Sequence, residues 1–430
     1  MLELLKILPQ KSADTDFRQL SINPVIKYYF LEIVRYYNQL NYIVKKTLRS
    51  IKLDGDFENN FKSQLLYLAY KIIICKTPVA EIIDEYPYLD DGLNRFISKL
   101  SHFSWKKALI GKSKVEKLSL RFAFPSFFIN KLLHVMDIQT IKENMKHMNS
   151  NLQRNAFYIR PMKLFENEDL NEITRIIKKQ LIKDGIDVKL DNDIPYIFRI
   201  SYRDRLKVLN HALYEQKKIL FQDKGSIGVI QALDPKPNDF ILDMCAAPGV
   251  KTNLINLYSL NKAKLILCDI NEKRIKKIHK FIDIKNDLNN FTLNIDSTVN
   301  IFRSENFFDK ILIDAPCTGS GALLENPGLK WKQNSRFLAQ NVIIQEKLIE
   351  NALRLIKPGG IIVFSTCSMY PEEGEYHLIK FKDFIEPIAV PKWLSSGYCI
   401  KNEEFSFIGR TFPSIHHCQG FFISKFKRKE

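Results

Sequence analysis

Two cysteines and four aspartates are the residues of this 430-residue chain whose types and spacing suggest chemistry. The cysteines are Cys317 and Cys367, and the aspartates are Asp243, Asp269, Asp296 and Asp314. Each lies at or just beyond the end of a short apolar run. A thiolate can add to an electrophilic carbon, and a carboxylate can bind ribose hydroxyls or move a proton. A lone aspartate in such a place is often a turn former, but the whole set predicts a binding and catalytic site.

The elements that position these residues alternate in type from residue 240 onward. The apolar runs predict strands at 240–244, 264–269, 291–295, 310–315 and 360–366, with helices at 253–260, 271–282 and 336–356. Alternating strands and helices indicate βαβ units, and therefore an α/β fold with a doubly wound, mostly parallel sheet. Ligands of such sheets bind outside the carboxyl ends of the strands, which is where the cysteines and aspartates fall.

The loop CAAPGVKT (245–252) after the first strand indicates the class of cofactor. Ala246, Ala247 and Gly249 keep it small, so its backbone can approach a ligand closely. Asp269 follows Gly249 by twenty residues, a spacing that suits ribose hydroxyls. The loop lacks the G-x-G-x-x-G pattern that a pyrophosphate requires, which argues against NAD. S-adenosylmethionine has no pyrophosphate, and nearby carboxylates favour its sulfonium charge.

The part of the chain before the sheet is expected to be largely helical. Apolar residues at 61–73 have the spacing of a buried helix face, and Pro78 opens another helix. A strand at 157–164 and a helix at 171–185, ending on a glycine, follow. We therefore expect a helical domain at 1–150, a mixed α/β linking subdomain at 151–232 and the sheet domain at 233–430.

The charge balance favours a polyanionic partner. Lys and Arg number 65 against 48 Asp and Glu, a net +17, and residues 1–150 carry a net +8 from 23 basic and 15 acidic residues. A lysine-rich composition of the organism's proteins would give the same surplus. The segment 103–121 has six basic residues and one acid, with Phe103 and Trp105 close by. It fits either a solvated helix face or a surface that binds phosphates.

Several classes are excluded by composition and pattern. No apolar run approaches the length of a membrane helix, and residues 1–10 lack the features of a signal peptide. The seven cysteines are odd in number and have no metal-binding spacing, so we expect neither disulfides nor a metal. These features predict a cytoplasmic protein without membrane contact, and we expect it to be a monomer.

Four motifs resemble those of the RNA (cytosine-5) methyltransferases of the Fmu/Sun/NSUN kind. They are DMCAAPGVKT, LCDINEKRI, DAPCTGSG and FSTCS, and the resemblance covers about residues 150–430. Two cysteines, one in DAPC and one in TCS, make the match specific. Residues 1–150 resemble, more weakly, the NusB-like helical RNA-binding domain of the bacterial ribosomal-RNA members. The resemblance implies a Rossmann-like methyltransferase sheet behind an all-α N-terminal domain.

The resemblance also implies roles for individual residues. It assigns the covalent adduct with C6 of a cytosine to Cys367 and its release to Cys317, with Lys251 near the catalytic centre. Asp314 is placed to hydrogen-bond or protonate N3 of the base. We expect S-adenosylmethionine to be bound by Cys245, Ala246, Ala247, Pro248, Gly249, Val250, Lys251, Asp269, Arg274, Asp296 and Asp314. Packing remains an alternative for Cys245 and a surface role for Arg274.

The chain departs from the family pattern at a few positions. Val250 replaces the second glycine of the usual GGKT, and Gln419 stands where an acid is common. Leu324 and Glu325 occupy a stretch where the family usually has arginines, which puts RNA contacts in doubt rather than the chemistry.

The expected function is S-adenosylmethionine-dependent methylation of C5 of a cytosine in RNA, with ribosomal RNA as the expected substrate. This is an RNA (cytosine-C5-)-methyltransferase activity in rRNA processing. Transfer RNA is the alternative substrate, because no motif reads a nucleotide sequence. A DNA cytosine methyltransferase is a near rival, and it would be expected to have a Gly-rich first loop and to use the cysteine of a Pro-Cys pair as its nucleophile. This chain has no Gly-rich first loop, and it has the TCS cysteine in addition to the one in DAPC. A non-catalytic RNA-binding assembly factor is the rival from another class, and the presence of both cysteines argues against it.

Overall fold

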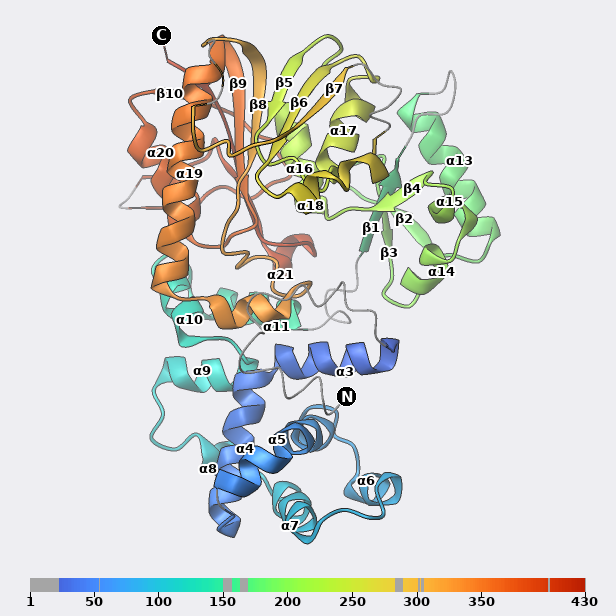
Figure 1. Cartoon of the computed structure of the whole chain (residues 1–430), viewed down its shortest axis with the longest axis vertical. Helices are drawn as coiled ribbons and strands as arrows, with labels where there is room; N and C mark the ends of the chain where they lie inside the picture. Colours follow the sequence, from blue (N-terminus) through green and yellow to red (C-terminus); the bar gives the residue numbers. More distant parts are fainter. Residues whose placement is uncertain are drawn as a thin grey trace. The chain divides into compact units, whose positions relative to one another are not determined.

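The computed structural model describes residues 23–53, 55–149, 157–162, 169–282, 289–300, 302, 305–400 and 403–429. These residues form two compact units (Figure 1). The helical unit comprises the described residues up to Met145 together with Glu325–Asn334, and the sheet unit comprises Lys146–Leu324 and the residues from Ser335 onward. The predicted domain boundary at 150/151 lies outside the described residues, and the one predicted after 232 falls within a helix.

The helical unit is built from amphipathic helices around one apolar core. Ser113 caps one helix in a capping box with Glu116, and Asp90 caps another. The predicted helix at 61–73 is present as α5 and a π-helical continuation. The helices are α3 (Pro24–Arg35), α4 (Tyr37–Ile51), α5 (Gly55–Ala69), η2 (Tyr70–Ile74), α6 (Val79–Glu85), α7 (Asp91–Leu100), α8 (Trp105–Ala108), α9 (Lys114–Phe122), α10 (Ser126–Leu132) and α11 (Ile138–Asn149), the last of which crosses into the sheet unit.

The segment 325–334 contains a 3₁₀ helix, η4 (Pro327–Lys332), and packs within the helical unit. Trp331 donates its indole N–H to the carbonyl oxygen of Val34 at 2.7 Å. The buried Lys330 Nζ lies 4.0 Å from the ring centroid of Phe124 and donates to the carbonyl oxygen of Arg35 at 3.2 Å. Burial holds the pKa of Lys330 well below its ordinary value. These contacts explain why this stretch belongs to the helical unit.

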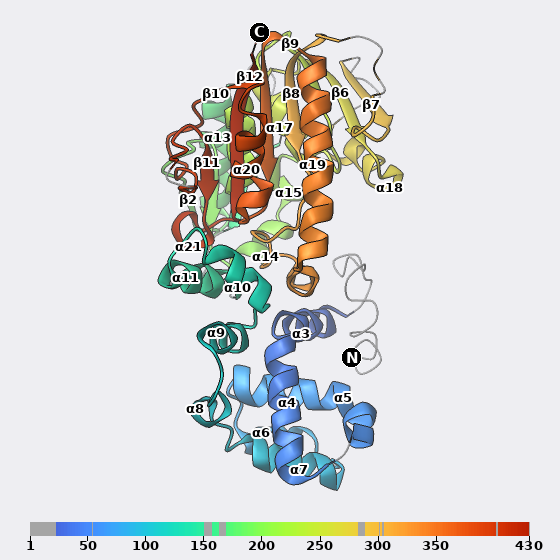
Figure 2. The same cartoon turned by 90° about the vertical axis from the view of Figure 1, so that its left-hand side faces the viewer.

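The predicted α/β sheet is confirmed, with strand order β10-β12-β9-β8-β5-β6-β7 and β11 paired to β12 (Figures 1 and 2). The five central strands are parallel, whereas β10, β11 and β12 form an antiparallel extension. The long helix α19 runs beside β8 and β9. The elements are α16 (Lys224–Leu233), β5 (Phe240–Asp243), α17 (Val250–Tyr258), β6 (Lys264–Asp269), β7 (Asn290–Asn294), β8 (Phe308–Asp314), α19 (Ser335–Leu355), β9 (Ile356–Thr366), η5 (Pro371–Glu373), α20 (Glu375–Phe381), β10 (Ile385–Ile388), β11 (Gly409–Thr411), α21 (Pro413–His416) and β12 (Phe421–Arg428).

The prediction of one continuous helix over 271–282 is wrong in length. The structure has a single turn, α18 (Glu272–Ile275), followed by the 3₁₀ turn η3 (Ile278–Lys280). Only a narrow set of side chains in this Lys-rich stretch is buried, among them Ile275 and Ile278. One turn is enough to bury them, and packing of an amphipathic face is what sustains longer helices.

The part between the two predicted boundaries forms a second, antiparallel sheet of order β2-β3-β1-β4. The strand and helix predicted near 157–185 are confirmed, and Gly185 follows the helix with φ of +74°. The elements are β1 (Phe157–Pro161), α13 (Leu170–Lys183), β2 (Val188–Leu190), β3 (Phe198–Ile200), α14 (Arg205–Leu209), α15 (Ala212–Glu215) and β4 (Ile219–Phe221).

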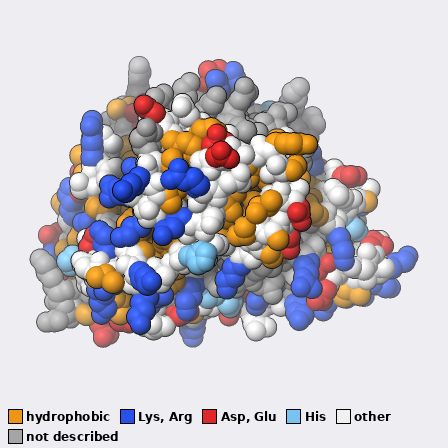
Figure 3. Space-filling model, turned by 90° about the horizontal axis from the view of Figure 1, so that it is seen from below, with side chains coloured by type: hydrophobic (Ala, Val, Ile, Leu, Met, Phe, Trp, Pro, Cys, Tyr) orange, Lys and Arg blue, Asp and Glu red, His pale blue; other side chains and the backbone are white. Residues whose placement is uncertain are grey.

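The surface of the described residues is rich in basic side chains. On the face drawn in Figure 3, Lys and Arg side chains gather beside hydrophobic ones. Within the predicted basic segment 103–121, Lys106 and Lys107 are exposed, while Lys112 pairs with Glu116 at 2.8 Å. Phosphate binding by that segment stays a prediction. No helix among the described residues has the length and apolarity to span a membrane.

Candidate active site

The two cysteines singled out from the sequence lie together in the structure. Cys317 follows β8 and Cys367 follows β9, and these strands are parallel neighbours whose carboxyl ends share one edge of the sheet. Their Sγ atoms are 3.3 Å apart. The hydrogen bond with Cys367 and burial raise the pKa of Cys317 well above that of a free thiol. Cys317 is therefore held in its protonated form.

Lys251 and Asp314 form an ion pair at the same edge. Lys251, in the first turn of α17, donates from Nζ to Oδ2 of Asp314 at 2.6 Å. Ser365 Oγ donates to the other carboxylate oxygen at 3.0 Å. Both oxygens of Asp314 thus have a partner, which fixes the plane of the carboxyl group three residues before Cys317. The lysine predicted to lie near the catalytic centre or to pair with an aspartate does pair with Asp314.

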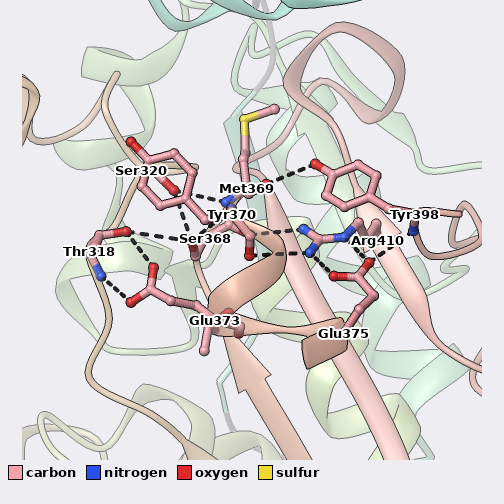
Figure 4. Close-up of polar contacts among 10 residues, drawn as sticks. Thr318, Ser320, Ser368, Met369, Tyr370, Glu373, Glu375, Tyr398 and Arg410 are labelled. Atoms are coloured by element: carbon pink, nitrogen blue, oxygen red, sulfur yellow. Dashed lines mark hydrogen bonds and ion pairs between the residues drawn. The ribbon is translucent and has the colours of Figure 1, made fainter. Parts of the chain in front are cut away.

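A buried polar network supports the loops that carry the cysteines (Figure 4). The carboxylate of Glu373 accepts hydrogen bonds from the backbone N–H of Thr318 at 2.8 Å and from the hydroxyl of Thr318. Ser320 Oγ lies 2.9 Å from Ser368 Oγ and accepts the backbone N–H of Met369 at 2.9 Å. Burial raises the pKa of Glu373. Because the residues following each cysteine are joined to one another, the two loops are held as one assembly.

A buried ion pair supports the same assembly. Arg410 on β11 donates to both carboxylate oxygens of Glu375, from Nε at 2.7 Å and from Nη2 at 2.5 Å. Arg410 Nη1 also donates to the carbonyl oxygen of Ser368 at 3.1 Å, and its guanidinium stacks 3.9 Å from the ring centroid of Tyr398. The Tyr398 hydroxyl donates to the carbonyl oxygen of Met369 at 2.9 Å. Arg410 therefore anchors the residues directly after Cys367 (Figure 4).

Gly321 lets two backbones meet next to the cysteines. Its N–H donates to the carbonyl oxygen of Cys367 at 3.0 Å, and its own carbonyl accepts the N–H of Gly420 at 3.0 Å. A Cβ added at Gly321 would stand 1.9 Å from the carbonyl oxygen of Gly420. No side chain fits at this position without displacing the backbone.

Replacing Gly321 with alanine is expected to destabilise the chain and to reduce any activity of the site. The added methyl group must push the backbone of Gly420 away and disturb the loop after Cys317, at a cost of about 1–3 kcal/mol. Chemical denaturation measures this change. The control is Gly55→Ala, because a Cβ at Gly55 meets nothing within 4 Å. Equal stability of the two variants would contradict this account of the contact.

The first loop and Asp269 form a second group of predicted residues at this edge. Asp269 accepts the backbone N–H of Ala247 at 3.2 Å and that of Asn271 at 2.8 Å. The exposed Arg274 donates to the carbonyl oxygen of Ala247. Gly249 has φ of +104°, and a Cβ there would come 3.1 Å from the Cα of Ile278. The loop is thus a compact backbone turn, tied to the end of β6 through Asp269.

Asp243 at the end of β5 has an unsatisfied carboxylate oxygen. The side chain is 1% exposed, Oδ1 accepts the backbone N–H of Cys245 at 3.3 Å, and Oδ2 has no hydrogen-bond partner in the structure. Burial, followed by the charge of Asp314, raises the pKa of Asp243 to about 7. Burial, followed by the charge of Asp243, raises the pKa of the Cys245 thiol. A buried carboxyl group with a free oxygen suits a ligand that brings a donor or a positive charge.

Asp243 is expected to make the folded chain less stable as the pH rises from about 4 to about 7. The folded state keeps a proton, with a pKa of about 7, that the unfolded state releases near 3.8. Stability therefore falls with rising pH by at most about 1.4 kcal/mol per pH unit in that window. Urea unfolding of wild type and Asp243→Asn at several pH values measures this. The stability of wild type relative to the variant should fall as the pH rises, and a pH-independent difference would refute the assignment.

Asp296 lies after β7, as predicted, but its interactions among the described residues are local. It accepts the backbone N–H and the hydroxyl of Thr298 at 2.9 and 2.7 Å. Its neighbour Ser297 donates to the carbonyl oxygen of Met244 at 3.0 Å, which ties this loop to the end of β5. The loop thus belongs to the site, whereas the structure does not bring the Asp296 carboxylate into contact with the other three aspartates.

Sequence reasoning missed the residues that brace the site. Arg160 of β1 is fully buried and donates to the side chains of Gln222 and Asn253 and to the carbonyl oxygen of Val250. It thereby links the antiparallel sheet to the first turn of α17. A charged residue inside an apolar strand was the available signal for Arg160. Glu373, Glu375 and Arg410 left no comparable signal, because they are distant in sequence from the residues that they contact.

The remaining cysteines are apart from the two that meet. Cys75 and Cys399 are exposed, and Cys268 and Cys418 are buried. Among the residues that the structure describes, no group of three or more His, Cys, Asp or Glu side chains could hold a metal ion.

Comparison with known proteins finds similarity in the sheet domain. The family model described as 16S rRNA methyltransferase RsmB/F matches residues 230–427. Ribosomal RNA small subunit methyltransferase B from Yersinia pseudotuberculosis is 32% identical over 192 residues, and the protein of that name from Yersinia pestis matches equally well. The match covers 42% of this chain and 43% of those relatives, so the chain spans about two fifths of their length.

Solved structures share the fold. The crystal structure of PH0851 has a TM-score of 0.73 and 22% identity, covering 96% of this chain and 91% of that one. A methyltransferase homolog protein from Pyrococcus horikoshii has a TM-score of 0.61 and 25% identity, covering 74% and 100%. NSun6 from Pyrococcus horikoshii with SFG has a TM-score of 0.60 and 19% identity, covering 72% and 99%. The predicted methyltransferase fold is confirmed, and the NusB-like identity of the helical part stays a prediction.

Proposed function

We propose that the chain methylates C5 of a cytosine in ribosomal RNA, with S-adenosylmethionine as the methyl donor, and that residues 230–427, which match the RsmB/F methyltransferase model, form its catalytic domain. The observation that carries the proposal is the pair of cysteines 3.3 Å apart, beside the Lys251–Asp314 ion pair. C5 of cytosine is a weak nucleophile, and addition of a thiolate to C6 makes it an enamine-like one. Two thiols at one strand edge suit a reaction in which an adduct must form and then be released.

The proposed steps distribute the work among five side chains. The Cys367 thiolate adds to C6 while Asp314, which Lys251 and Ser365 orient, shares or delivers a proton at N3. S-adenosylmethionine supplies an electrophilic methyl group, which C5 takes up as the bond to the sulfonium breaks. The Cys317 thiol passes its own proton to water and takes the C5 proton in its place, the C6–S bond breaks to restore the Cys367 thiolate, and N3 returns its proton to Asp314. The net release is one proton.

The described residues fit the methyl donor. We propose that Asp269, at the end of β6, binds the ribose hydroxyls and that the small loop 245–249 lets the donor approach the backbone. The free Oδ2 of the buried Asp243 would accept a hydrogen bond from the donor or stabilise a positive charge on it. Arg274 shapes the loop through its bond to the carbonyl oxygen of Ala247. Asp296 acts through its loop rather than through a contact with Asp269.

Ribosomal RNA is proposed as the substrate because the curated relatives are ribosomal RNA small subunit methyltransferases. The target base must leave its stack to meet Cys367, which favours a loop or a single strand. The test is transfer of a labelled methyl group to total RNA from a strain that lacks this gene. The RNA is fractionated by size and digested to nucleosides. Label in 5-methylcytidine of the ribosomal fraction is the expected result. Label confined to transfer RNA, or none at all, would refute the proposal.

A further inference from the structure

A pocket of about 480 Å³ lies within the helical unit, in the size range of small-ligand sites. Most of its lining comes from α4, with one residue from α9 and one from the segment 325–334. The lining residues are Tyr37, Asn38, Asn41, Tyr42, Lys45, Lys46, Arg49, Leu120 and Trp331. The lining thus combines aromatic, amide and basic groups. None of these residues belongs to the candidate active site.

Three cations of this pocket have no acidic partner. Lys45, Lys46 and Arg49 are exposed on the last turns of α4, and among the described residues none forms an ion pair with a carboxylate. Some other cations of the unit do form ion pairs, as Lys112 does with Glu116 at 2.8 Å. Unpaired cations that converge on one hollow attract an anion such as a phosphate.

Aromatic rings lie next to these cations. Tyr37 and Trp331 pack edge to face with centroids 6.2 Å apart, and Trp331 is fixed by the bond from its indole N–H to Val34. Both rings remain partly exposed. Asn41 also lines the pocket, and its amide makes no hydrogen bond with any described residue, which leaves a donor and an acceptor for a base edge.

We propose that this pocket binds a nucleotide of single-stranded RNA, with the phosphate at Lys45, Lys46 and Arg49 and the base against Trp331 and Tyr37. A rigid aromatic ring beside unpaired cations is the combination that binds single-stranded nucleic acid without reading its sequence. The proposal deepens the proposed function and rests on it for the identity of the partner. It adds α4 and Trp331 to the predicted RNA surface at segment 103–121, from which Leu120 lines the pocket.

The experiment measures binding of a fluorescein-labelled oligouridylate to the full chain by fluorescence anisotropy at several salt concentrations. Lys46→Glu is expected to weaken binding at least about ten-fold and to lower the slope of log affinity against log salt by about 0.7 for each lost phosphate contact. Lys99→Glu is the matched control, because Lys99 is an exposed lysine on α7 outside the pocket. Trp331→Ala should lower the affinity for the RNA by about five- to hundred-fold, and Trp331→Phe should retain most of the wild-type affinity.

Two outcomes would overturn the proposal. One is equal affinity of Lys46→Glu and Lys99→Glu for the RNA. The other is displacement of the RNA by a polyglutamate peptide at equal charge concentration, which would indicate a protein partner. Failure of the proposed function would give a different result. In that case the wild type would bind RNA through this pocket but would transfer no methyl group to any RNA. Both lysines are exposed, so the comparison does not depend on a variant that fails to fold.

Discussion

The Cys317→Ala variant is expected to accumulate as a covalent complex with its RNA substrate. If Cys367 forms the adduct and Cys317 assists its release, removing the Cys317 thiol leaves addition and methyl transfer possible but blocks elimination. The RNA should then stay attached to the protein through denaturing electrophoresis, and turnover should fall by a factor of at least about 100, as for the loss of an acid–base catalyst. Addition of the methyl donor should increase the trapped fraction.

The matched variant is Cys367→Ala, which should neither turn over nor form a complex. The double variant with both alanines should behave like Cys367→Ala, because no nucleophile remains to be trapped. Release by Cys317→Ala at the wild-type rate would refute the division of roles between the two thiols. A complex in Cys367→Ala would mean that Cys317 is the nucleophile. The 3.3 Å between the sulfur atoms is compatible with either direction, so the experiment decides.

Replacing Arg410 with methionine is expected to destabilise the chain by about 3–5 kcal/mol, because the carboxylate of Glu375 would stay buried without its partner. The side chains of Arg410 and Glu375 are 1% and 0% exposed. The variant should also lose methyl transfer, since Arg410 holds the carbonyl oxygen of Ser368 directly after Cys367. Urea denaturation and the transfer of labelled methyl groups measure the two effects.

The double variant Arg410→Met with Glu375→Met separates the ion pair from the packing of its side chains. Removing both charges leaves no buried ion unpaired, so the double variant should be more stable than Arg410→Met alone. If the two single effects simply add, Arg410 acts through its stacking on Tyr398 and not through the charge of Glu375.

The central sheet and the residues at its edge were predictable from the sequence. Buried parallel strands leave continuous apolar runs, so the residues that end them, from Asp243 to Cys367, could be placed at one edge before the structure was known. The two thiols meet because β8 and β9 are neighbours in the sheet, and this strand order comes from the structure. Short-range patterns of this kind depend on local sequence alone.

Contacts between distant parts of the chain were not predictable in this way. Glu373 meets Thr318 across 55 residues, and Lys330 meets Arg35 across 295. Such pairs leave no periodic pattern and no spacing rule. The helix predicted over 271–282 was too long for a related reason, since its lysines are compatible with a helix and only tertiary packing limits it to one turn.

The segment 325–334 makes the helical unit discontinuous in sequence, and this limits how the protein can be divided. The chain leaves the sheet unit after Leu324, buries Lys330 in the helical unit, packs the partly exposed Trp331 against its core, and returns at Ser335. A fragment cut near residue 145 would separate segment 325–334 from the helical unit. The indole ring of Trp331 and the aliphatic stem of Lys330 would then be more exposed to water. The two units must therefore be expressed and engineered together. An exchange of helical units between related proteins would have to include these ten residues.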